Sequence, residues 1–455
     1  MQIKSLTCRP VLMLLASLAT ATLTASETPS IEDDLPIRKD PLPRLVRTIE
    51  FGEYGSKYVR LGDLDGDGLP EILLTQAKAP GGEHKVIITC LTALNLEGKV
   101  LWQVGQPDIR NIYFGSDLPV QIYDLDRDGT NEVVYIPDEK HVLTILDGRT
   151  GRPKKEVQLA GGHDSLLFAD FSGQGYAQEI LVKDRYTSFW VYDKDFHLLW
   201  SKQNVNPGHY PMNFDVDGDG RDELLCGYTL YDHDGKELWS HPEFGLHNDA
   251  VYIDDMDGDG QPEIAIATSG DAVLLDAAGK VLFRKKMDHC QHALIGKFRP
   301  DLPGKQVCYI SRMDQKEGEA FRYSDISMFT VSGELLWHST ENFWWMGGLV
   351  VDNWTGNPNV NLVGLYSRGF APPALVDGHG REVARFPFPA AILEKGTGPQ
   401  GQDRYDDYYM QHIDCYGDER DEILVFNHKE LRIYTNAALW QKPRLYNNNY
   451  YPGRL

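Results

Sequence analysis

One short pattern recurs along most of the chain and limits what it can fold into. Three aspartates alternate with other residues, a glycine follows, and a glutamate ends the loop, as in "DDMDGDGQPEIAIAT" from residue 254. Carboxylate oxygens at this spacing can converge on one hard cation, and the glycine permits the sharp turn. The flanking residues are β-branched or aromatic, as in strands. Because the glutamate comes too early for a calcium loop between two helices, the pattern predicts a metal loop between two strands.

Four copies keep the complete ligand set, and we expect them to bind Ca²⁺. Their ligands are Asp63, Asp65, Asp67 and Glu71; Asp124, Asp126, Asp128 and Glu132; Asp215, Asp217, Asp219 and Glu223; and Asp255, Asp257, Asp259 and Glu263. Copies at Asp170 and Asp414 have lost ligands, and "GKFRPDLPGKQVCYI" and "VDNWTGNPNVNLVGL" hold the same place without them. For these four degenerate copies an aspartate-rich or plain turn without metal is the preferred interpretation.

Between the loops a second pattern predicts outer hairpins. Stretches such as "LTALNLEGKVLWQV" and "VLLDAAGKVLFRKK" read as two short strands around a glycine turn, with a Leu-Trp or Leu-Phe pair opening the second strand. Each unit then has four strands, and units about 40 to 60 residues apart are typical of propeller blades. The predicted class is all-β: a β-propeller of eight blades, with seven as the alternative. Each blade has four antiparallel strands, with the acidic loop between its first and second strands. "RLVRTIEFG" is expected to complete the last blade and close the ring.

The chain of 455 residues is long enough for two or three domains, but a closed ring can use it as one. We expect a secretory signal peptide over residues 1–26, where Lys4 and Arg9 precede an apolar run and small residues, and hence a secreted or periplasmic protein. A leader is expected over 27–44, the propeller over 45–440 and a tail over 441–455.

Cysteine usage and net charge limit which metals and binding partners the chain is expected to have. The five cysteines after the signal form no CxxC pair, so buried thiols are expected rather than disulfides or a zinc site. The net charge of −22 disfavours nucleic acid and anionic membranes. We expect a monomer with no membrane span.

The "DxDGDGxxE" units resemble FG-GAP (VCBS-type) propeller repeats. "GKVLWQVGQPDIRN", "VQIYDLDRDGTNEVV" and "GHYPMNFDVDGDGRDELLCGYTLYDHDGKELW" are similar, more narrowly, to the propeller of family 11 rhamnogalacturonan lyases. The resemblance covers most of residues 58–450 in patches. It implies an eight-bladed, calcium-stabilised propeller that cleaves a pectin-like or other uronate polysaccharide by β-elimination. No catalytic motif of that family can be matched, and half of the blades lack the metal ligands.

Propeller geometry indicates where a site would lie. The starts of the innermost strands should converge opposite the acidic loops, and the loops from second to third strands open on the same face. The residues at these places are His163, His209, Tyr210, His247, His289, His292, Trp344, Trp345, Tyr408, Tyr409 and His412, with Arg185, Tyr186, Arg312, Tyr366 and Arg368 from the second set of loops. A single histidine here is more often a hydrogen-bonding plug than a catalyst, but six histidines at nearly one register indicate a site.

Eliminating a uronate needs a cation that neutralises the carboxylate, a base and a proton donor. Arg185 or Arg312 is the predicted neutraliser, and His209 or His247 the base. Tyr210 or Tyr186 is the predicted donor, and His292 completes the catalytic candidates. The predicted sugar-binding residues are His163, Trp344, Trp345, Tyr366, Arg368, Tyr409 and His412, with tryptophan as a stacking platform.

Two other functions account for parts of the same pattern. A non-catalytic carbohydrate-binding or adhesion propeller would keep the same loops and aromatic residues without a poised base. A quinone-dependent dehydrogenase is suggested by the Leu-Trp hairpins, although the adjacent cysteine pair often found over that cofactor is absent from the sequence.

Overall fold

The structure is a computed structural model that describes residues 43–80, 86–112, 118–312, 324–339, 347–357, 359–366, 372–387 and 407–436, and the backbone of 392–394 and 404–405. All of these belong to one unit of the chain, Pro36–Leu455. The predicted signal peptide, the predicted tail, and Trp344, Trp345 and Arg368 lie outside the described residues.

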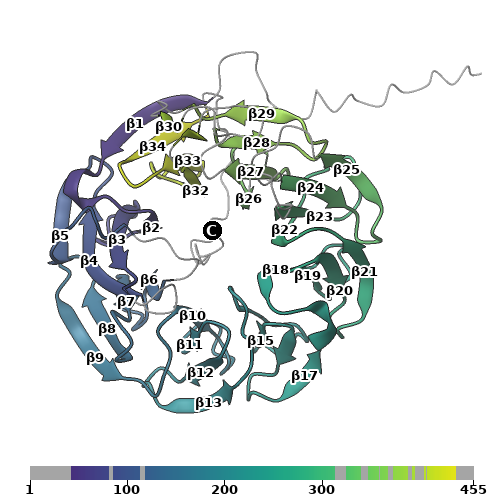
Figure 1. Ribbon diagram of the computed structural model, residues 1–455, viewed down its shortest axis with the longest axis horizontal. Helices are drawn as coiled ribbons and strands as arrows, with labels where there is room; N and C mark the ends of the chain where they lie inside the picture. Colours follow the sequence, from purple (N-terminus) through teal and green to yellow (C-terminus); the bar gives the residue numbers. More distant parts are fainter. Residues whose placement is uncertain are drawn as a thin grey trace, which may run out of the picture. The chain divides into compact units, whose positions relative to one another are not determined.

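Eight four-stranded antiparallel sheets follow one another around a ring (Figure 1). Blade 1 comprises β2 (Tyr58–Gly62), β3 (Glu71–Lys78), β4 (Ile87–Leu94) and β5 (Val100–Gly105), and blade 2 comprises β6 (Val120–Tyr123), β7 (Glu132–Tyr135), β8 (Val142–Asp147) and β9 (Pro153–Gln158). Blade 3 comprises β10 (Ser165–Ala169), β11 (Glu179–Asp184), β12 (Ser188–Tyr192) and β13 (Leu198–Gln203), and blade 4 comprises β14 (Met212–Phe214), β15 (Glu223–Cys226), β16 (Thr229–Tyr231) and β17 (Glu237–Ser240).

The second half of the ring repeats this order. Blade 5 comprises β18 (Asn248–Asp254), β19 (Glu263–Thr268), β20 (Asp271–Leu275) and β21 (Val281–Lys286), and blade 6 comprises β22 (Cys290–Gly296), β23 (Gln306–Arg312), β24 (Ser324–Phe329) and β25 (Leu335–Ser339). Blade 7 comprises β26 (Gly347–Val351), β27 (Leu362–Tyr366), β28 (Ala374–Val376) and β29 (Glu382–Arg385), and blade 8 comprises β32 (Tyr409–Ile413), β33 (Glu422–Phe426), β34 (Glu430–Thr435) and β1 (Arg44–Glu50). A separate pair, β30 (Ile392–Glu394) and β31 (Arg404–Tyr405), lies between blades 7 and 8 in sequence.

The predicted architecture is confirmed, with eight blades rather than seven. The helical elements of the described residues are two 3₁₀ turns, η2 (Gly52–Tyr54) and η3 (Pro242–Phe244). No helix in this part of the chain has the length and apolar character needed to cross a membrane.

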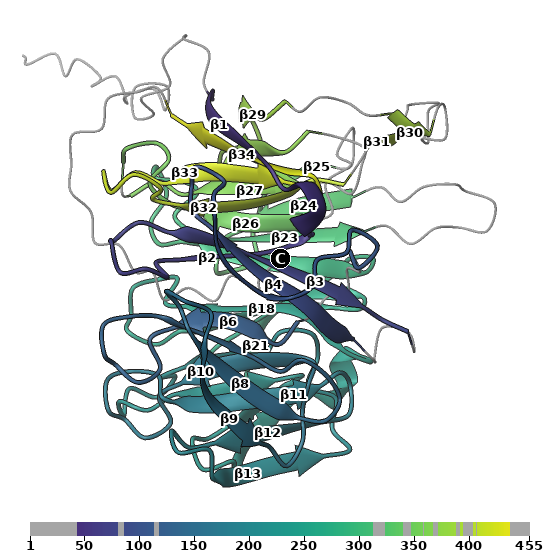
Figure 2. The same cartoon turned by 90° about the vertical axis from the view of Figure 1, so that its left-hand side faces the viewer.

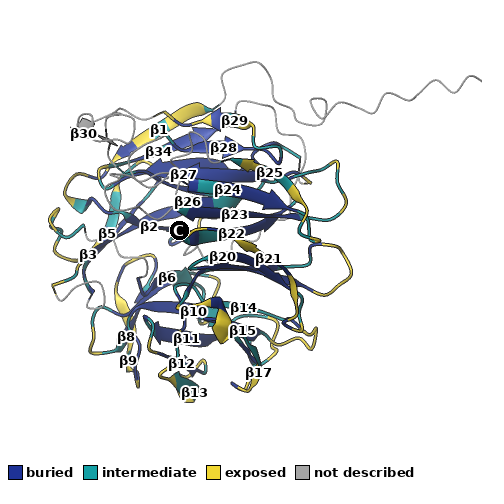
Figure 3. Ribbon diagram, turned by 45° about the vertical axis from the view of Figure 1, so that its right-hand side comes forward, coloured by how far each residue is buried: buried dark blue, intermediate teal, exposed yellow. Residues whose placement is uncertain are grey.

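The strands of each blade differ in burial according to their place in the sheet. The second strands are buried along their length, as in β19 and β23, because both of their faces pack against neighbouring blades. The outermost strands, such as β9 and β21, are mostly exposed. Figure 3 shows this contrast between β23 and the outer β1.

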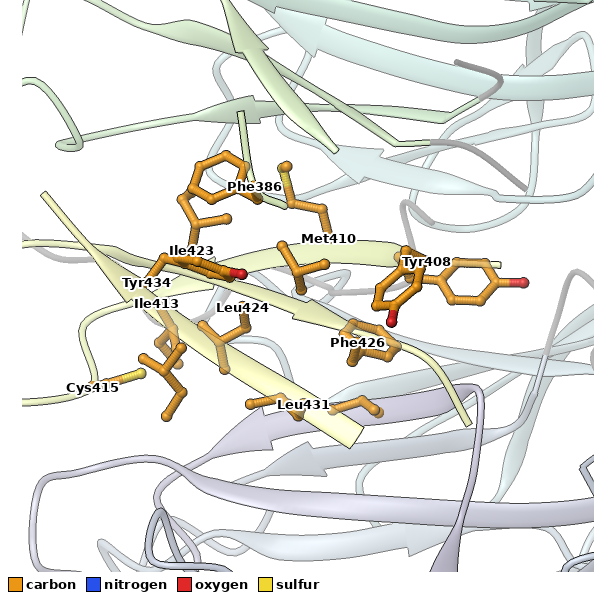
Figure 4. Packing of buried hydrophobic residues seen from close by; sticks show 14 of the residues in the cluster. Phe386, Tyr408, Met410, Ile413, Cys415, Ile423, Leu424, Phe426, Leu431 and Tyr434 are labelled. Atoms are coloured by element: carbon orange, nitrogen blue, oxygen red, sulfur yellow. The ribbon is translucent and has the colours of Figure 1, made fainter. Parts of the chain in front are cut away.

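The ring is closed by the N-terminal strand, as predicted. β1 pairs antiparallel with β34 from Arg44↔Thr435 to Glu50↔Glu430, and both Figures 1 and 2 show the two strands side by side. A hydrophobic cluster extends from blade 7 through blade 8 to blade 1; Figure 4 shows Phe386 of blade 7 near Met410 and Ile423 of blade 8. Burying this apolar surface between three blades stabilises the closed ring.

The Leu-Trp motif joins successive blades. The Trp102 indole of blade 1 donates to the Gly148 carbonyl oxygen in blade 2 at 2.6 Å. Its ring lies where a Cβ on Gly151 would approach it to 2.6 Å, and Gly151 has a φ of +66°. Trp200, Trp239, Phe283 and Trp337 face the turn glycines Gly235, Gly279, Gly333 and Gly380 of the next blade in the same way. The turn glycine and the aromatic residue of the repeat therefore form one interblade contact.

Five described cysteines are buried thiols that form no disulfide, as expected. They are Cys90, Cys226, Cys290, Cys308 and Cys415.

We predict that Trp102→Ala lowers the free energy of unfolding by about 3 kcal/mol or more, because it leaves a cavity between blades 1 and 2. Leu335→Ala, at a side chain that is 52% exposed, should change it by less than about 1 kcal/mol. Equal effects in a denaturant titration would show that the indole contact does not join the blades.

Candidate functional site

The acidic loops of blades 1, 4 and 5 share one pattern of internal hydrogen bonds. The first aspartate accepts backbone N–H groups three and five residues later; Asp63 receives them from Gly66 at 2.6 Å and Gly68 at 2.9 Å. The closing glutamate Glu71 accepts the N–H of Leu64 at 2.7 Å. Loops 215–223 and 255–263 repeat these contacts. These bonds fix the turn and bring the carboxylates together.

The grouped carboxylates could hold a divalent metal. Oxygens of Asp63, Asp65 and Glu71 lie within 4.8 Å of one another, as do those of the corresponding residues Asp215, Asp217 and Glu223. Burial, followed by the negative charges of nearby aspartates, raises the pKa of Glu71, Glu223 and Glu263 to about 7. The possible ligands are all carboxylate oxygens, and their negative charges repel one another unless a cation lies between them. Such a ligand set fits Ca²⁺.

The degenerate loops keep the parts that shape the turn. Asp170 accepts the N–H of Gly175 at 2.6 Å, and Asp414 accepts that of Glu419 at 2.7 Å. Glu422 still accepts the N–H of Cys415 at 3.0 Å. The first aspartate and the closing glutamate are therefore explained by backbone hydrogen bonds even where the other carboxylates are missing.

The innermost strands of blades 4 to 6 bring three histidines to one carboxylate at the other end of the sheets. Asp249 Oδ2 accepts His289 Nε2 at 3.0 Å and lies 3.5 Å from His247 Nε2. His209 Nε2 is 3.8 Å from Asp249 Oδ1, which also accepts Gln291 Nε2 at 2.9 Å. The side chains of His209, His247 and His289 are 12%, 19% and 15% exposed, so solvent reaches each of them in part.

Tyr186 completes this group from the loop between β11 and β12. Its hydroxyl lies 2.7 Å from His209 Nε2, and its ring centroid is 5.2 Å from that of His247. The Tyr186 backbone has a φ of +65°, in the left-handed region. A non-glycine residue there costs about 1 kcal/mol or more, and such strain is concentrated at functional sites. The local geometry thus holds the phenol against two imidazoles.

A close approach of blades 4 and 5 sets the histidine spacing. A Cβ on Gly208 would lie 1.4 Å from Asn248 Oδ1, so only glycine fits there, and its φ is +70°. The next residue, His209, donates its N–H to the Asn248 carbonyl at 3.2 Å. The His247 carbonyl accepts hydroxyl groups from Ser269, at 2.9 Å, and from Tyr228. The backbone on both sides of the histidine pair is therefore anchored.

Charge around His247 favours its neutral form. Burial lowers the pKa of His247, and His209, His289 and Arg312 lower it further, whereas Asp249 opposes the shift. The Arg312 guanidinium lies 3.1 Å from His289 Nδ1, which must accept because arginine only donates. His289 therefore donates to Asp249 through Nε2, and Arg312 is held at the edge of the group.

The structure brings together five of the predicted residues: His209, His247, Tyr186, Arg312 and His289. Tyr210 is adjacent, with its ring centroid 6.1 Å from that of His209. Arg185 instead points into blade 3, where its side chain is 2% exposed and lies 3.5 Å from Asp164 Oδ1.

The remaining predicted residues have other neighbours. His163 lies 2.9 Å from Asp184 and beside His141. Tyr366 contacts both His292 and Tyr409, and the Tyr409 ring is buried in the hydrophobic cluster of blade 8. His412 lies near the acidic-loop end of β32, 2.7 Å from Asp421.

Sequence reasoning missed Asp249 and Gln291. Asp249 follows His247 by two residues, and strand alternation would have put the two side chains on one face. Gln291 follows His289 by the same spacing, but its contact with Asp249 depends on the packing of β22 beside β18.

No protein-family model matches the chain. Rhamnogalacturonan exolyase YesX of Bacillus subtilis (strain 168) is 26% identical over 266 residues, which are 45% of this chain and 43% of that protein. Rhamnogalacturonan endolyase YesW of the same organism is 24% identical over 278 residues, 47% of this chain and 43% of that protein. The matched stretch thus spans less than half the length of these curated relatives.

Solved structures show the same fold over more of the chain. The crystal structure of the exotype rhamnogalacturonan lyase YesX matches 88% of this chain and 75% of that chain, with a TM-score of 0.56 and 21% identity. The V. cholerae biofilm matrix protein Bap1 matches 89% of both chains, with a TM-score of 0.58 and 14% identity. The chain is thus related in sequence to rhamnogalacturonan lyases and shares its propeller fold with proteins of different function.

We predict that Asp249→Asn lowers the pKa of His247 further, because it removes the anion that favours the imidazolium. A histidine titration followed by NMR measures this change. Asp184→Asn, next to His163, is the matched control and should leave the His247 titration unchanged; an unaltered His247 pKa in Asp249→Asn would contradict the electrostatic account.

Proposed function

We propose that this chain is a secreted, calcium-stabilised propeller that cleaves a rhamnogalacturonan-type or other uronate polysaccharide by β-elimination. The observation that carries the proposal is the contact of Tyr186 with His209, 2.7 Å long, beside His247 and Arg312. The sequence relationship to two rhamnogalacturonan lyases supports the reaction class.

The reaction defines three tasks. A base removes the proton from C5 of the uronate, and the electrons of that bond form the C4=C5 double bond. The bond from C4 to the glycosidic oxygen breaks, and this leaving oxygen takes a proton. A cation near the carboxylate acidifies C5 by stabilising the charge that develops in the transition state.

We assign the base to His247. A neutral imidazole can accept a proton, and the lowered pKa keeps His247 neutral at lower pH than an ordinary histidine. Asp249, near its Nε2, would stabilise the imidazolium formed when the proton arrives. His209 remains the alternative base from the sequence analysis.

Tyr186 is the proposed proton donor. Its hydroxyl contacts His209 Nε2, so a proton given to the leaving oxygen can be replaced through that imidazole. Tyr210, whose ring centroid is 6.1 Å from that of His209, is the second choice.

Arg312 suits the neutralising role better than Arg185. The Arg185 side chain is almost wholly buried in blade 3, near Asp164, whereas Arg312 lies at the edge of the histidine group. The predicted sugar-binding roles of Trp344, Trp345 and Arg368 stay predictions, since these residues lie outside the described part of the chain.

Ca²⁺ held by the acidic loops would lie away from these residues. The loops that could hold it join first to second strands, whereas the histidine group lies at the starts of the first strands, so the ion would stabilise the fold rather than enter the reaction. Because a fold of this kind does not fix a function, a non-catalytic binding protein is the contrary outcome of the tests below.

We predict that His247→Ala lowers kcat on rhamnogalacturonan by about 10² to 10⁴, the usual contribution of general acid–base catalysis, with little change in melting temperature. In the wild type, kcat/KM should rise as the pH passes the pKa of His247, which lies below the ordinary value for histidine, and should level off at higher pH. Only neutral His247 accepts the proton. His197→Ala, on an outer hairpin and 78% exposed, is the control.

Release of unsaturated uronate, followed by its ultraviolet absorbance, measures both effects. Binding of the polysaccharide without any unsaturated product would contradict the lyase and favour the binding protein.

We predict that chelation lowers the melting temperature, since a ligand that binds only the folded state adds about 2.7 kcal/mol per site at 100 times its Kd. Asp217→Ala or Asp255→Ala should reduce bound Ca²⁺, whereas Asp414→Ala should have less effect. Protein prepared without chelator that contains no calcium by elemental analysis would contradict this expectation.

A further inference from the structure

Blade 2 departs from the repeat at one position of its outermost strand. In seven blades a β-bulge lies near the start of the fourth strand and leaves one residue unpaired in the register. That residue is Leu101, Leu199, Leu238, Leu282, Leu336 or Val383 in six of them. In blade 2 it is Lys154.

The Lys154 ammonium lies among the carboxylates of its own acidic loop. Nζ is 2.7 Å from Asp126 Oδ2, 2.6 Å from Glu132 Oε1 and 3.6 Å from Asp128 Oδ2. Calcium–oxygen distances are about 2.3 to 2.6 Å, so the nitrogen stands close to where a bound ion would stand. Burial raises the pKa of Glu132, but its hydrogen bond to Lys154 opposes the rise.

The residue after Lys154 also differs from that of the other blades. The next residue in blades 1, 3, 4, 5 and 6 is the aromatic side chain that packs on the following blade, but in blade 2 it is Lys155. Its Nζ lies 4.3 Å from the centroid of the Phe196 ring in blade 3. A cation–π contact of Lys155 thus takes the place of the aromatic contact. In blade 2, Lys154 and Lys155 replace the Leu-Trp or Leu-Phe pair of blades 1, 3, 4, 5 and 6.

The second loop also lacks part of the shared turn. Arg127, with a φ of +60°, stands where the other complete loops have Gly66, Gly218 and Gly258. Asp63 Oδ1 accepts the N–H of Gly66, whereas Asp124 Oδ1 is buried without a hydrogen-bond partner among the described residues. The loop has kept its carboxylates and the hydrogen bond from the Gly129 N–H to Asp124 Oδ2, at 3.1 Å, but not the hydrogen bond from the residue three positions after the first aspartate.

We propose that Lys154 supplies the cation of the second acidic loop from within the chain, so that this loop excludes Ca²⁺ while the loops of blades 1, 4 and 5 bind it. The inference rests on the calcium sites proposed above and changes one of them: in the loop from Asp124 to Glu132, Lys154 forms an internal ion-pair network with Asp126, Asp128 and Glu132 instead of a metal site. Lysine has three donors for such a cage, and its charge meets the same need as the ion.

A second loop shows the same use of an ammonium. In blade 6, Lys297 occupies the position of the first aspartate, and its Nζ donates to the Gly304 carbonyl at 2.7 Å and to that of Leu302. Gln306 replaces the closing glutamate and accepts the N–H of Arg299 at 2.6 Å. An internal lysine can therefore hold a loop of this ring together.

Calcium counting with matched variants tests the proposal. Each protein is equilibrated with Ca²⁺, freed of excess ion by gel filtration and analysed for calcium per chain. Lys154→Leu, which restores the residue of the other blades, should bind one more Ca²⁺ than the wild type. Leu282→Lys, the reciprocal change in blade 5, should bind one fewer.

Two further variants identify the loop concerned. Asp126→Asn should leave the calcium count of the wild type unchanged but remove the ion gained by Lys154→Leu, whereas Asp257→Asn should lower the wild-type count by one. A loss of calcium in Asp126→Asn alone, or no gain in Lys154→Leu, would overturn the proposal.

Melting in chelator separates this proposal from the proposed calcium sites. Without metal, Lys154→Leu leaves Asp126, Asp128 and Glu132 uncompensated and should lower the melting temperature by about 2 °C or more. Lys140→Leu, at a lysine whose side chain is 79% exposed, is the control and should change it little. Equal melting temperatures would overturn the role of Lys154 even if no loop binds calcium, an outcome that would contradict only the proposed metal sites.

Discussion

Burial of both faces of every sheet against its neighbours is the constraint on which the rest of the structure depends. A single blade cannot bury both faces of its apolar second strand. The eight sheets therefore stabilise one another only as a closed ring. Closure needs β1, from the start of the described chain, to pair with β34 at its end, and a continuous apolar cluster then joins blades 7, 8 and 1. The Trp102-type contacts extend this locking around the rim.

The closed ring separates two kinds of chemistry. Acidic loops follow the first strands, where backbone hydrogen bonds hold the turns and the grouped carboxylates could hold a metal. The starts of the same strands bring His209, His247 and Asp249 together at the opposite end of blades 4 and 5. Because the acidic loops and the histidine group lie at opposite ends of the innermost strands, a change in the loop of blade 2 should leave the histidine group unaltered.

Much of this arrangement was predictable because the acidic-loop pattern and the Leu-Trp hairpins recur along the sequence. The loop spacing and the Leu-Trp hairpins predicted four-stranded blades, and the register of His209, His247 and His289 predicted their convergence. Contacts between individual side chains were harder to predict from the sequence. Arg185 and Tyr186 are neighbours in one loop, yet the positive φ of Tyr186 turns its phenol to the histidines while Arg185 enters blade 3. The place of Lys154 in the second loop depends on packing between strands that no short motif encodes.

The central claim is that the histidine group performs elimination on a uronate polysaccharide. Digesting rhamnogalacturonan in water enriched in heavy oxygen and analysing the products by mass spectrometry tests it most directly. Elimination predicts unsaturated uronate at the new non-reducing ends, and reducing ends that gain heavy oxygen only by the slow exchange of their hemiacetal hydroxyl with water. Saturated products that carry the heavy oxygen would show hydrolysis instead, and a polymer that is bound but not shortened would show a binding protein; either result would contradict the account.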